Sequence, residues 1–116
     1  MAIHPRILAL VGAIHLSSGC TSGASSVDCT QVHTPKYSEM TAWARCTTCH
    51  SSAVTGASRA GAPPDINFDK YDDAVADADR ALSEVEEGAM PPAGNPGLSA
   101  AEKDQIIYWA SCDTPQ

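Results

Sequence analysis

Apolar residues recur every three or four positions in three stretches of the chain, which is the spacing of one face of a helix. In the first stretch, Thr34 and Pro35 have the residue types of an N-cap and a first helical position, and Tyr37 and Met40 follow at helical spacing. We therefore expect a first helix that begins near Pro35 and runs into Cys46.

The second stretch separates apolar from charged residues along a longer segment. Gly88 follows it, where a glycine would end the helix. The pattern predicts a second helix with one buried and one solvated side. The apolar side has Tyr71, Ala74, Val75, Ala78, Leu82 and Val85, and the charged side has Asp72, Asp73, Asp77, Asp79, Arg80 and Glu84.

The third stretch lies close to the end of the chain. Ser99 and Glu102 form a capping-box pattern ahead of Ile106, Ile107 and Trp109, which predicts a closing helix. The intervening segments 51–65 and 90–97 are rich in glycine, proline and small residues and are expected to be loops. Because no strand-like alternation competes with the helical pattern, the sequence predicts a small all-α fold of about three main helices.

The start of the chain has the composition of an export signal. Arg6 precedes an apolar run at 7–16, and small residues lead to Cys20. The segment resembles a bacterial lipoprotein signal, but Leu16 lies four rather than three residues before Cys20, so lipidation of Cys20 stays one of two alternatives. We expect a signal at 1–19, a flexible tether at 20–28 and one domain at 29–116, exported to the periplasm or outer surface.

A C-x-x-C-H motif spans residues 46–50. Two thiols at this spacing add to the two vinyl groups on one edge of a haem, which brings the adjacent imidazole beneath the iron. The motif indicates one c-type haem, attached covalently at Cys46 and Cys49 and ligated by His50. A buried macrocycle would also add apolar mass to a core with only one Phe and two Trp.

Two other uses of such a motif compete with haem attachment. A thiol-exchange pair would favour a βαβ setting, which the helical pattern does not provide. A zinc site is the stronger alternative, because Cys29 and His33 together with Cys46 and Cys49 would supply four ligands at plausible spacings.

A sixth iron ligand is expected from a methionine, since a thioether favours reduced iron. Met1 belongs to the signal, and Met40 precedes the attachment site on the same predicted helix. Met90 lies in a proline-rich loop that would hold a side chain over the iron with little loss of entropy. His33 and His50 are the two histidines after residue 20, so His33 is the competitor of Met90 for the sixth iron position.

Four features together resemble the small monohaem cytochrome c domains over about residues 35–111. These are the attachment motif at 46–50, the sequence EEGAMPP at 86–92, the Leu-Ser pair at 98–99 and the final helix with Trp109.

The resemblance implies a helical fold wrapped around one haem, with His50 as proximal ligand, Met90 as distal ligand and one-electron transfer as the activity. It also implies a proline carbonyl that accepts a hydrogen bond from the proximal imidazole and fixes its orientation. Pro63 and Pro64 are the candidates, although both prolines would equally suit a role in stiffening the loop.

Cys29 and Cys112 are the two cysteines that neither the haem nor a lipid would use. In an oxidising compartment, two such thiols in a small domain usually pair, so we expect a Cys29–Cys112 disulfide. The loop that it closes would contribute roughly 4 to 5 kcal/mol on an entropic model.

The charge of the chain restricts its partners. The formal net charge is −7, and it becomes −8 if Arg6 is lost with the signal, which disfavours a nucleic-acid partner. The acidity marks either solvated helix faces or a patch for a basic redox partner protein. The sequence thus predicts a monomeric electron carrier rather than an enzyme, with membrane contact only through a lipid anchor at Cys20. A haem enzyme or gas sensor is the first alternative, and a zinc-stapled interaction module is the second.

Overall fold

The structure, a computed structural model, describes residues 26–116. Its regular elements in this range are all helical, which confirms the predicted all-α class. The expectations for the signal at 1–19, for Cys20 and for most of the tether lie outside the described residues. The elements are the 3-10 turns η1 (Tyr37–Glu39) and η2 (Gly56–Arg59) and the helices α1 (Trp43–Cys46), α2 (Tyr71–Ala76), α3 (Ala78–Glu86) and α4 (Ala100–Ser111).

The predicted first helix is wrong in its extent, because Met40 is extended (φ −78°, ψ 113°) and separates η1 from α1. The Glu39 carboxylate accepts a hydrogen bond from the Lys36 N–H (3.0 Å), which closes η1 as a separate turn. The Ala42 N–H donates to Oε1 of Gln105 on α4 (3.0 Å). Tertiary hydrogen bonds thus replace the helical bonds that the local pattern predicts, and only the end of α1 at Cys46 agrees.

The predicted second helix is divided into α2 and α3 at Asp77, which has φ −107° and ψ 14°. Its predicted end is confirmed. Gly88 adopts φ +73°, its N–H donates to the Val85 carbonyl (3.2 Å), and the Ala89 N–H donates to the Glu84 carbonyl (2.9 Å). This pair of bonds is a Schellman motif, which needs a residue in the left-handed region at the position of Gly88.

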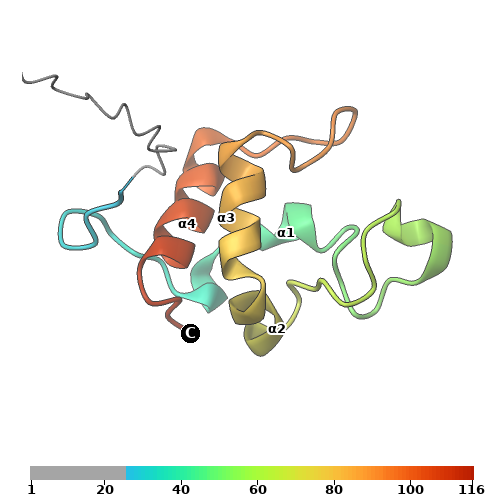
Figure 1. Cartoon of the computed structure of the whole chain (residues 1–116), viewed down its shortest axis with the longest axis horizontal. Coiled ribbons are helices and arrows are strands. Elements are labelled where there is room, and N and C mark those ends of the chain that lie inside the picture. Colours follow the sequence, from blue (N-terminus) through green and yellow to red (C-terminus); the bar gives the residue numbers. More distant parts are fainter. Residues whose placement is uncertain (1–25) are drawn as a thin grey trace, which may run out of the picture.

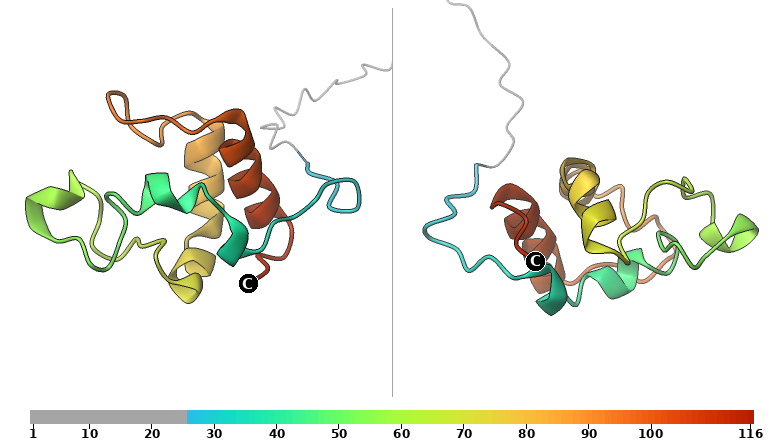
Figure 2. Two further views of the ribbon diagram at one scale, coloured as in Figure 1. Left: turned by 180° about the vertical axis from the view of Figure 1, so that it is seen from behind. Right: turned by 90° about the horizontal axis from the view of Figure 1, so that it is seen from below.

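Helices α3 and α4 lie side by side and form the main packed pair (Figure 1). Ala78, Ala81 and Val85 of α3 are buried, and their small side chains let the helices approach closely. Ile106 and Trp109 of α4 are fully buried against them. Ser99 caps α4 as predicted, since its hydroxyl accepts from the Glu102 N–H (3.2 Å) and its own N–H donates to the Glu102 carboxylate (2.8 Å). Figure 2 shows that α1 crosses one side of this pair.

Aromatic rings fill most of the remaining core. Trp43 of α1 stacks on Phe68 with ring centroids 5.3 Å apart, and it meets Trp109 edge-on at 5.2 Å. The last residues of the chain close over this cluster, because the Pro115 carbonyl accepts from the Tyr37 N–H (2.8 Å) and from Nε1 of Trp109 (2.9 Å). The core therefore depends on rings from both ends of the domain.

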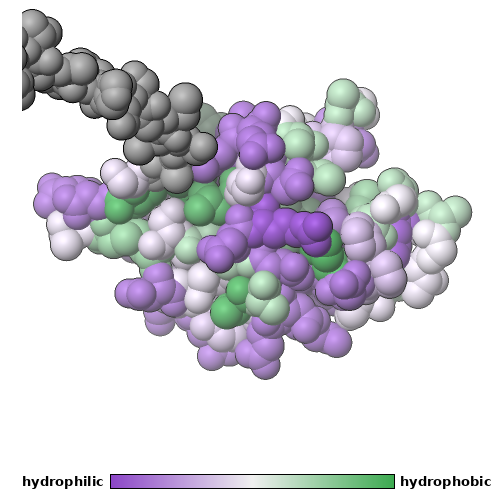
Figure 3. Space-filling view, viewed as in Figure 1, coloured by the Kyte–Doolittle hydropathy of each residue, from purple (hydrophilic) through white to green (hydrophobic). Residues whose placement is uncertain are grey.

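The face that carries α3 is mostly hydrophilic (Figure 3). Asp72, Asp79 and Glu86 are exposed, in keeping with the solvated side expected for this segment. No helix within residues 26–116 has the length and apolar character that a membrane span requires.

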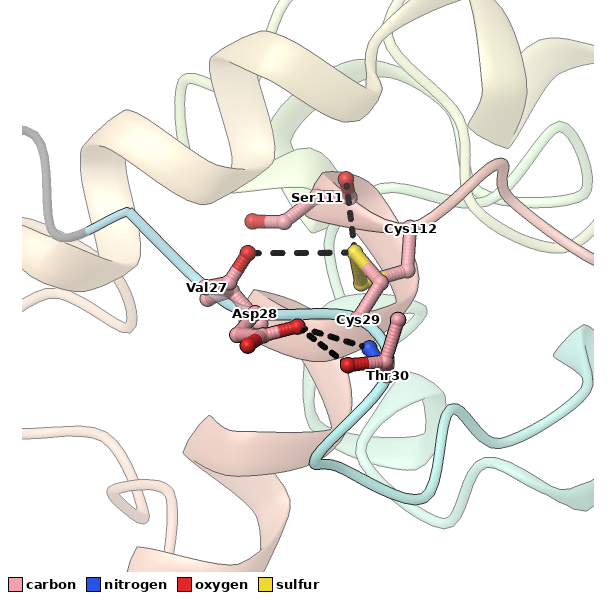
Figure 4. Close-up of a disulfide and its surroundings, with 6 residues drawn as sticks. All are labelled: Val27, Asp28, Cys29, Thr30, Ser111 and Cys112. Carbon is pink, nitrogen blue, oxygen red and sulfur yellow. Dashed lines mark hydrogen bonds between the residues drawn. A yellow bond between two sulfur atoms is a disulfide. The ribbon is translucent and has the colours of Figure 1, made fainter.

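A disulfide joins Cys29 to Cys112, with Cα atoms 5.7 Å apart (Figure 4). The Asp28 carboxylate accepts hydrogen bonds from the Thr30 N–H (3.0 Å) and hydroxyl (2.7 Å), and these bonds lower the pKa of Asp28. The turn that they form directs Cys29 toward the end of α4. The disulfide therefore ties the start of the domain to the end of its last helix.

Removing this disulfide with Cys29→Ala and Cys112→Ala is expected to lower the free energy of unfolding by roughly 4 to 5 kcal/mol, because the two cysteines are 83 positions apart. Urea denaturation of the double variant and the wild type measures the loss. Reduction of the Cys29–Cys112 disulfide in the wild type should lower its free energy of unfolding by a similar amount. Equal stability of the oxidised wild type and the double variant would show that the disulfide contributes nothing.

Candidate functional site

The C-x-x-C-H residues lie on one helical turn that continues past the end of α1. The N–H groups of Cys49 and His50 both donate to the Cys46 carbonyl, at 3.2 and 2.8 Å. Residues three and four positions apart on such a turn lie on the same side. The two thiols are free and half-buried, and the imidazole of His50 is half-buried beside them.

The Cys46 thiol has an altered acidity. Burial, together with the nearby negative charge of Glu102, raises the pKa of Cys46 to about 11. Glu102 itself is held by Arg45 at 3.5 Å and by Ser99. At neutral pH the Cys46 thiol is therefore protonated, because partial burial and the charge of Glu102 both disfavour the thiolate.

His50 is fixed in orientation by the segment that follows the loop. Its Nδ1 lies 3.2 Å from the Ile66 carbonyl oxygen, and its own carbonyl accepts from the Phe68 N–H (2.9 Å). The Phe68 ring packs edge-on against the imidazole at 5.5 Å. With Nδ1 donating to a carbonyl, Nε2 is the nitrogen left for a metal, which is the usual arrangement of a histidine ligand.

In the structure, the carbonyl beside the imidazole of His50 belongs to Ile66 and not to either proline candidate. The Pro63 carbonyl instead accepts from Nη2 of Arg59, and the Pro64 carbonyl accepts from Nδ2 of Asn67 (3.1 Å). Pro63 still lines the cavity described next, whereas Pro64 does not. The chain turns back at 63–66, so the carbonyl that reaches the imidazole comes two residues after the second proline.

A cavity of about 480 Å³ brings the predicted ligands together. Its walls include Cys46, Cys49 and His50 from the turn after α1, and Met90 from the loop between α3 and α4. The thioether of Met90 is accessible, since the residue is 37% exposed. The remainder of the wall is largely apolar and includes Ala44, Ile66, Phe68, Ala81, Val85 and Ile106.

The charged residues around the cavity are mainly basic, although the chain is acidic. Arg45, Arg59 and Arg80 line it, together with a single acid, Glu84. These are all the arginines of residues 26–116, whereas the three lysines in this range lie elsewhere. Anionic groups of a bound molecule would therefore be attracted to this cavity.

These residues fit a covalently bound haem. Two free thiols at the attachment spacing, an oriented imidazole and an accessible thioether meet at one cavity. The volume lies within the range of pockets for small molecules and cofactors, and the apolar lining suits a macrocycle. Cys46 and Cys49 would hold the group covalently, and His50 and Met90 would bind its iron.

The zinc alternative lacks its ligand set. Cys29 is in the disulfide with Cys112 and has no thiolate to offer a metal, and His33 is exposed. In the described part of the chain, no three His, Cys, Asp or Glu side chains are grouped as metal ligands. His33 also does not line the cavity, so Met90 has no histidine competitor there.

Asp69 fixes the start of the loop after His50. Its hydrogen bonds should make part of the free energy of unfolding sensitive to acid. Its carboxylate accepts from the Ser52 N–H (2.8 Å) and hydroxyl (2.7 Å), and these bonds lower the pKa of Asp69 below its usual 3.8. A depressed folded-state pKa gives stability that is present above the unfolded value and is lost as the pH falls through the folded value.

Asp69→Asn is thus expected to lower the free energy of unfolding at pH 7. The loss should be only about 1 kcal/mol, because water screens the exposed carboxylate. The difference from the wild type should shrink as the pH falls below 3.8. Urea titrations from pH 7 to pH 3 measure both effects, with Asp65→Asn as an exposed control in the same loop. A difference that stays constant over this range would contradict the assignment.

The sequence did not single out Arg59 and Ile66 as part of the site. Arg59 is buried in a loop whose other residues are mostly small and exposed. In the sequence, the only indication of its role is that a long charged side chain stands within this stretch of small residues. Ile66 acts through its backbone carbonyl, for which its side chain gives no signal. The function of this cavity is argued from its own residues, since comparison of the chain with protein-family models, curated proteins and solved structures found no match.

Proposed function

We propose that this protein is a one-electron carrier that holds a single c-type haem in the cavity, as the resemblance to small monohaem cytochrome c domains implies. Cys46 and Cys49 would hold the haem through thioether bonds, and His50 and Met90 would bind its iron. The haem supplies an iron that cycles between the ferrous and ferric states. The chain supplies the ligands, a low-dielectric wall and the charges around it.

One observation carries this proposal: the attachment motif and Met90 line the same cavity. The two segments are forty residues apart in the sequence and belong to different loops of the fold. A C-x-x-C-H motif alone is a short pattern, and a lone methionine is most often core packing. Their meeting at one apolar cavity, with His50 already oriented through Nδ1, is what an iron site with two axial ligands requires.

The arginines give independent support. A haem carries two propionate groups, so its cavity should offer positive charge in an otherwise acidic protein. Arg45, Arg59 and Arg80 supply that charge at the cavity wall. We assign no individual arginine to a propionate.

The loops around the cavity are the proposed contact surface for redox partners. Segments 51–65 and 89–97 extend away from the part of the chain around Cys29 in Figures 1 and 2. An exported monomer whose tether begins before Cys29 would therefore present its cavity on the side away from the anchor.

A second candidate function, a haem enzyme or gas sensor, is favoured by the exposure of Met90. A ligand that is 37% exposed can be displaced by a small molecule more easily than a buried one. Reduced spectra with and without carbon monoxide separate the two functions. Slow or absent binding supports the electron carrier, and rapid binding supports the sensor or enzyme.

The proposal is tested by the visible spectrum of the chain matured in a host with cytochrome c assembly machinery. We expect a Soret band, and we expect the haem to stay with the polypeptide after denaturation. Protein that contains stoichiometric zinc and no Soret band would overturn the proposal in favour of the zinc module.

A further inference from the structure

Arg59 is buried to an extent that is unusual for a charged side chain. It is 6% exposed, although its neighbours Ser58 and Ala60 in η2 and the following turn are exposed. Arginines are almost never fully buried unless they are paired with an anion. Within residues 26–116 the one ion pair joins Arg45 to Glu102, so no carboxylate neutralises Arg59.

The guanidinium group is held entirely by neutral oxygen atoms. Its Nε donates to a carbonyl in the turn after η2, and its two terminal nitrogens share five further acceptors. These bonds use the planar fork of an arginine, which a lysine does not reproduce. The acceptors are the carbonyls of Ala62 (3.1 Å), Ser51 (2.7 Å), Val54 (3.1 Å), Ile66 (2.9 Å) and Pro63, and Oδ1 of Asn67 (3.1 Å).

One of these acceptors also orients the haem-binding histidine. The Ile66 carbonyl lies 2.9 Å from Nη2 of Arg59 and 3.2 Å from Nδ1 of His50. A carbonyl oxygen has two lone pairs and can accept both bonds. Hydrogen bonds from charged donors are the stronger ones, so Arg59 fixes where this oxygen lies.

We propose that Arg59 is a positioning residue for His50: it holds the Ile66 carbonyl against the imidazole and places a buried positive charge beside the cavity. The inference rests on the proposed function, because its redox consequence needs a bound haem. It goes beyond that function by naming the residue that sets the properties of the proximal ligand.

Both effects of Arg59 on a haem iron have the same sign. A buried positive charge that lines the cavity disfavours the ferric state, in which the iron carries the greater charge. A carbonyl that already accepts from a guanidinium is a weaker acceptor for the imidazole, so His50 donates less electron density to the iron. Each effect favours ferrous iron, and Arg59 therefore raises the reduction potential.

The redox test compares Arg59→Gln with Arg59→Lys and with Lys70→Gln, a control that removes an exposed charge away from the cavity. We expect Arg59→Gln to keep its haem, since Cys46 and Cys49 are intact, and to have a lower midpoint potential. Arg59→Lys should lie between this variant and the wild type, and Lys70→Gln should match the wild type. A potential of Arg59→Gln that is as close to wild type as that of Lys70→Gln would overturn the proposal.

A measurement on the wild-type chain keeps the proposal testable if Arg59 variants do not fold. A guanidinium with every nitrogen bonded cannot rotate freely, so ¹⁵N spectra of the reduced protein should show separate, slowly exchanging Nη signals for Arg59. Averaged Arg59 signals would overturn the positioning role. A wild-type chain that matures without haem would overturn the proposed function, and these spectra would still decide whether Arg59 holds the loop.

Discussion

Replacing Cys46 and Cys49 together by alanine is expected to abolish covalent haem attachment. Among residues 26–116 the other two cysteines, Cys29 and Cys112, are joined to each other and have no thiol to offer a vinyl group. The cavity and His50 are left in place, so any haem that still binds is held without a covalent bond. Haem staining after denaturing electrophoresis measures the loss, which should be complete.

The disulfide variant Cys29→Ala/Cys112→Ala is the matched control for this experiment. It also removes two cysteines, but it leaves the attachment motif intact, so it should keep covalent haem and lose only stability. The two double variants thus distinguish the cysteines proposed to attach the haem from those of the structural disulfide. Haem that stays with the denatured Cys46→Ala/Cys49→Ala chain would refute the assignment.

Replacing Met90 by alanine is expected to open the sixth coordination position while the haem stays attached. The ferric protein should lose its near-infrared sulfur-to-iron band, and its potential should fall, because the thioether that favours ferrous iron is gone. Pro91 and Pro92 restrict the backbone after Met90, and Gly88 and Ser99 fix the two ends of its loop. Near-infrared spectra and a redox titration measure the two effects.

Met40→Ala is the control for Met90, since it removes the same thioether from the hydrophobic core. Met40 is 6% exposed, and we expect its loss to cost about 2 to 5 kcal/mol of stability. The near-infrared band should survive in this variant. If the band and the potential also survive in Met90→Ala, then Met90 is not the sixth ligand.

Local signals in the sequence were sufficient for the elements that depend on local bonds. The Ser99–Glu102 capping box and the glycine at Gly88 act within a few residues, and both are as predicted. The first helix was wrong because the N–H of Ala42 binds Gln105, 63 positions away in the sequence. No propensity of residues 35–46 contains that information.

The candidate site shows the same difference between what the local sequence encodes and what only the fold determines. The attachment motif and Met90 were identified by their side chains, which carry the chemistry. Pro63 and Pro64 are the candidates that the sequence offers as partner of His50, but every residue has a carbonyl, and the path of the loop places that of Ile66 beside the imidazole. Arg59, which fixes this path by hydrogen bonds, could be recognised only from its burial in the folded chain.

The raised pKa of the half-buried Cys46 thiol has a consequence for the maturation of the protein. Cys29 and Cys112 form a disulfide, whereas Cys46 and Cys49 are free, and under the proposed function these two thiols would have to stay reduced until haem is attached. Disulfide exchange requires a thiolate, and with a pKa of about 11 Cys46 is almost entirely protonated at neutral pH. Partial burial thus slows thiol–disulfide exchange at Cys46, which would favour formation of the Cys29–Cys112 disulfide before haem attachment.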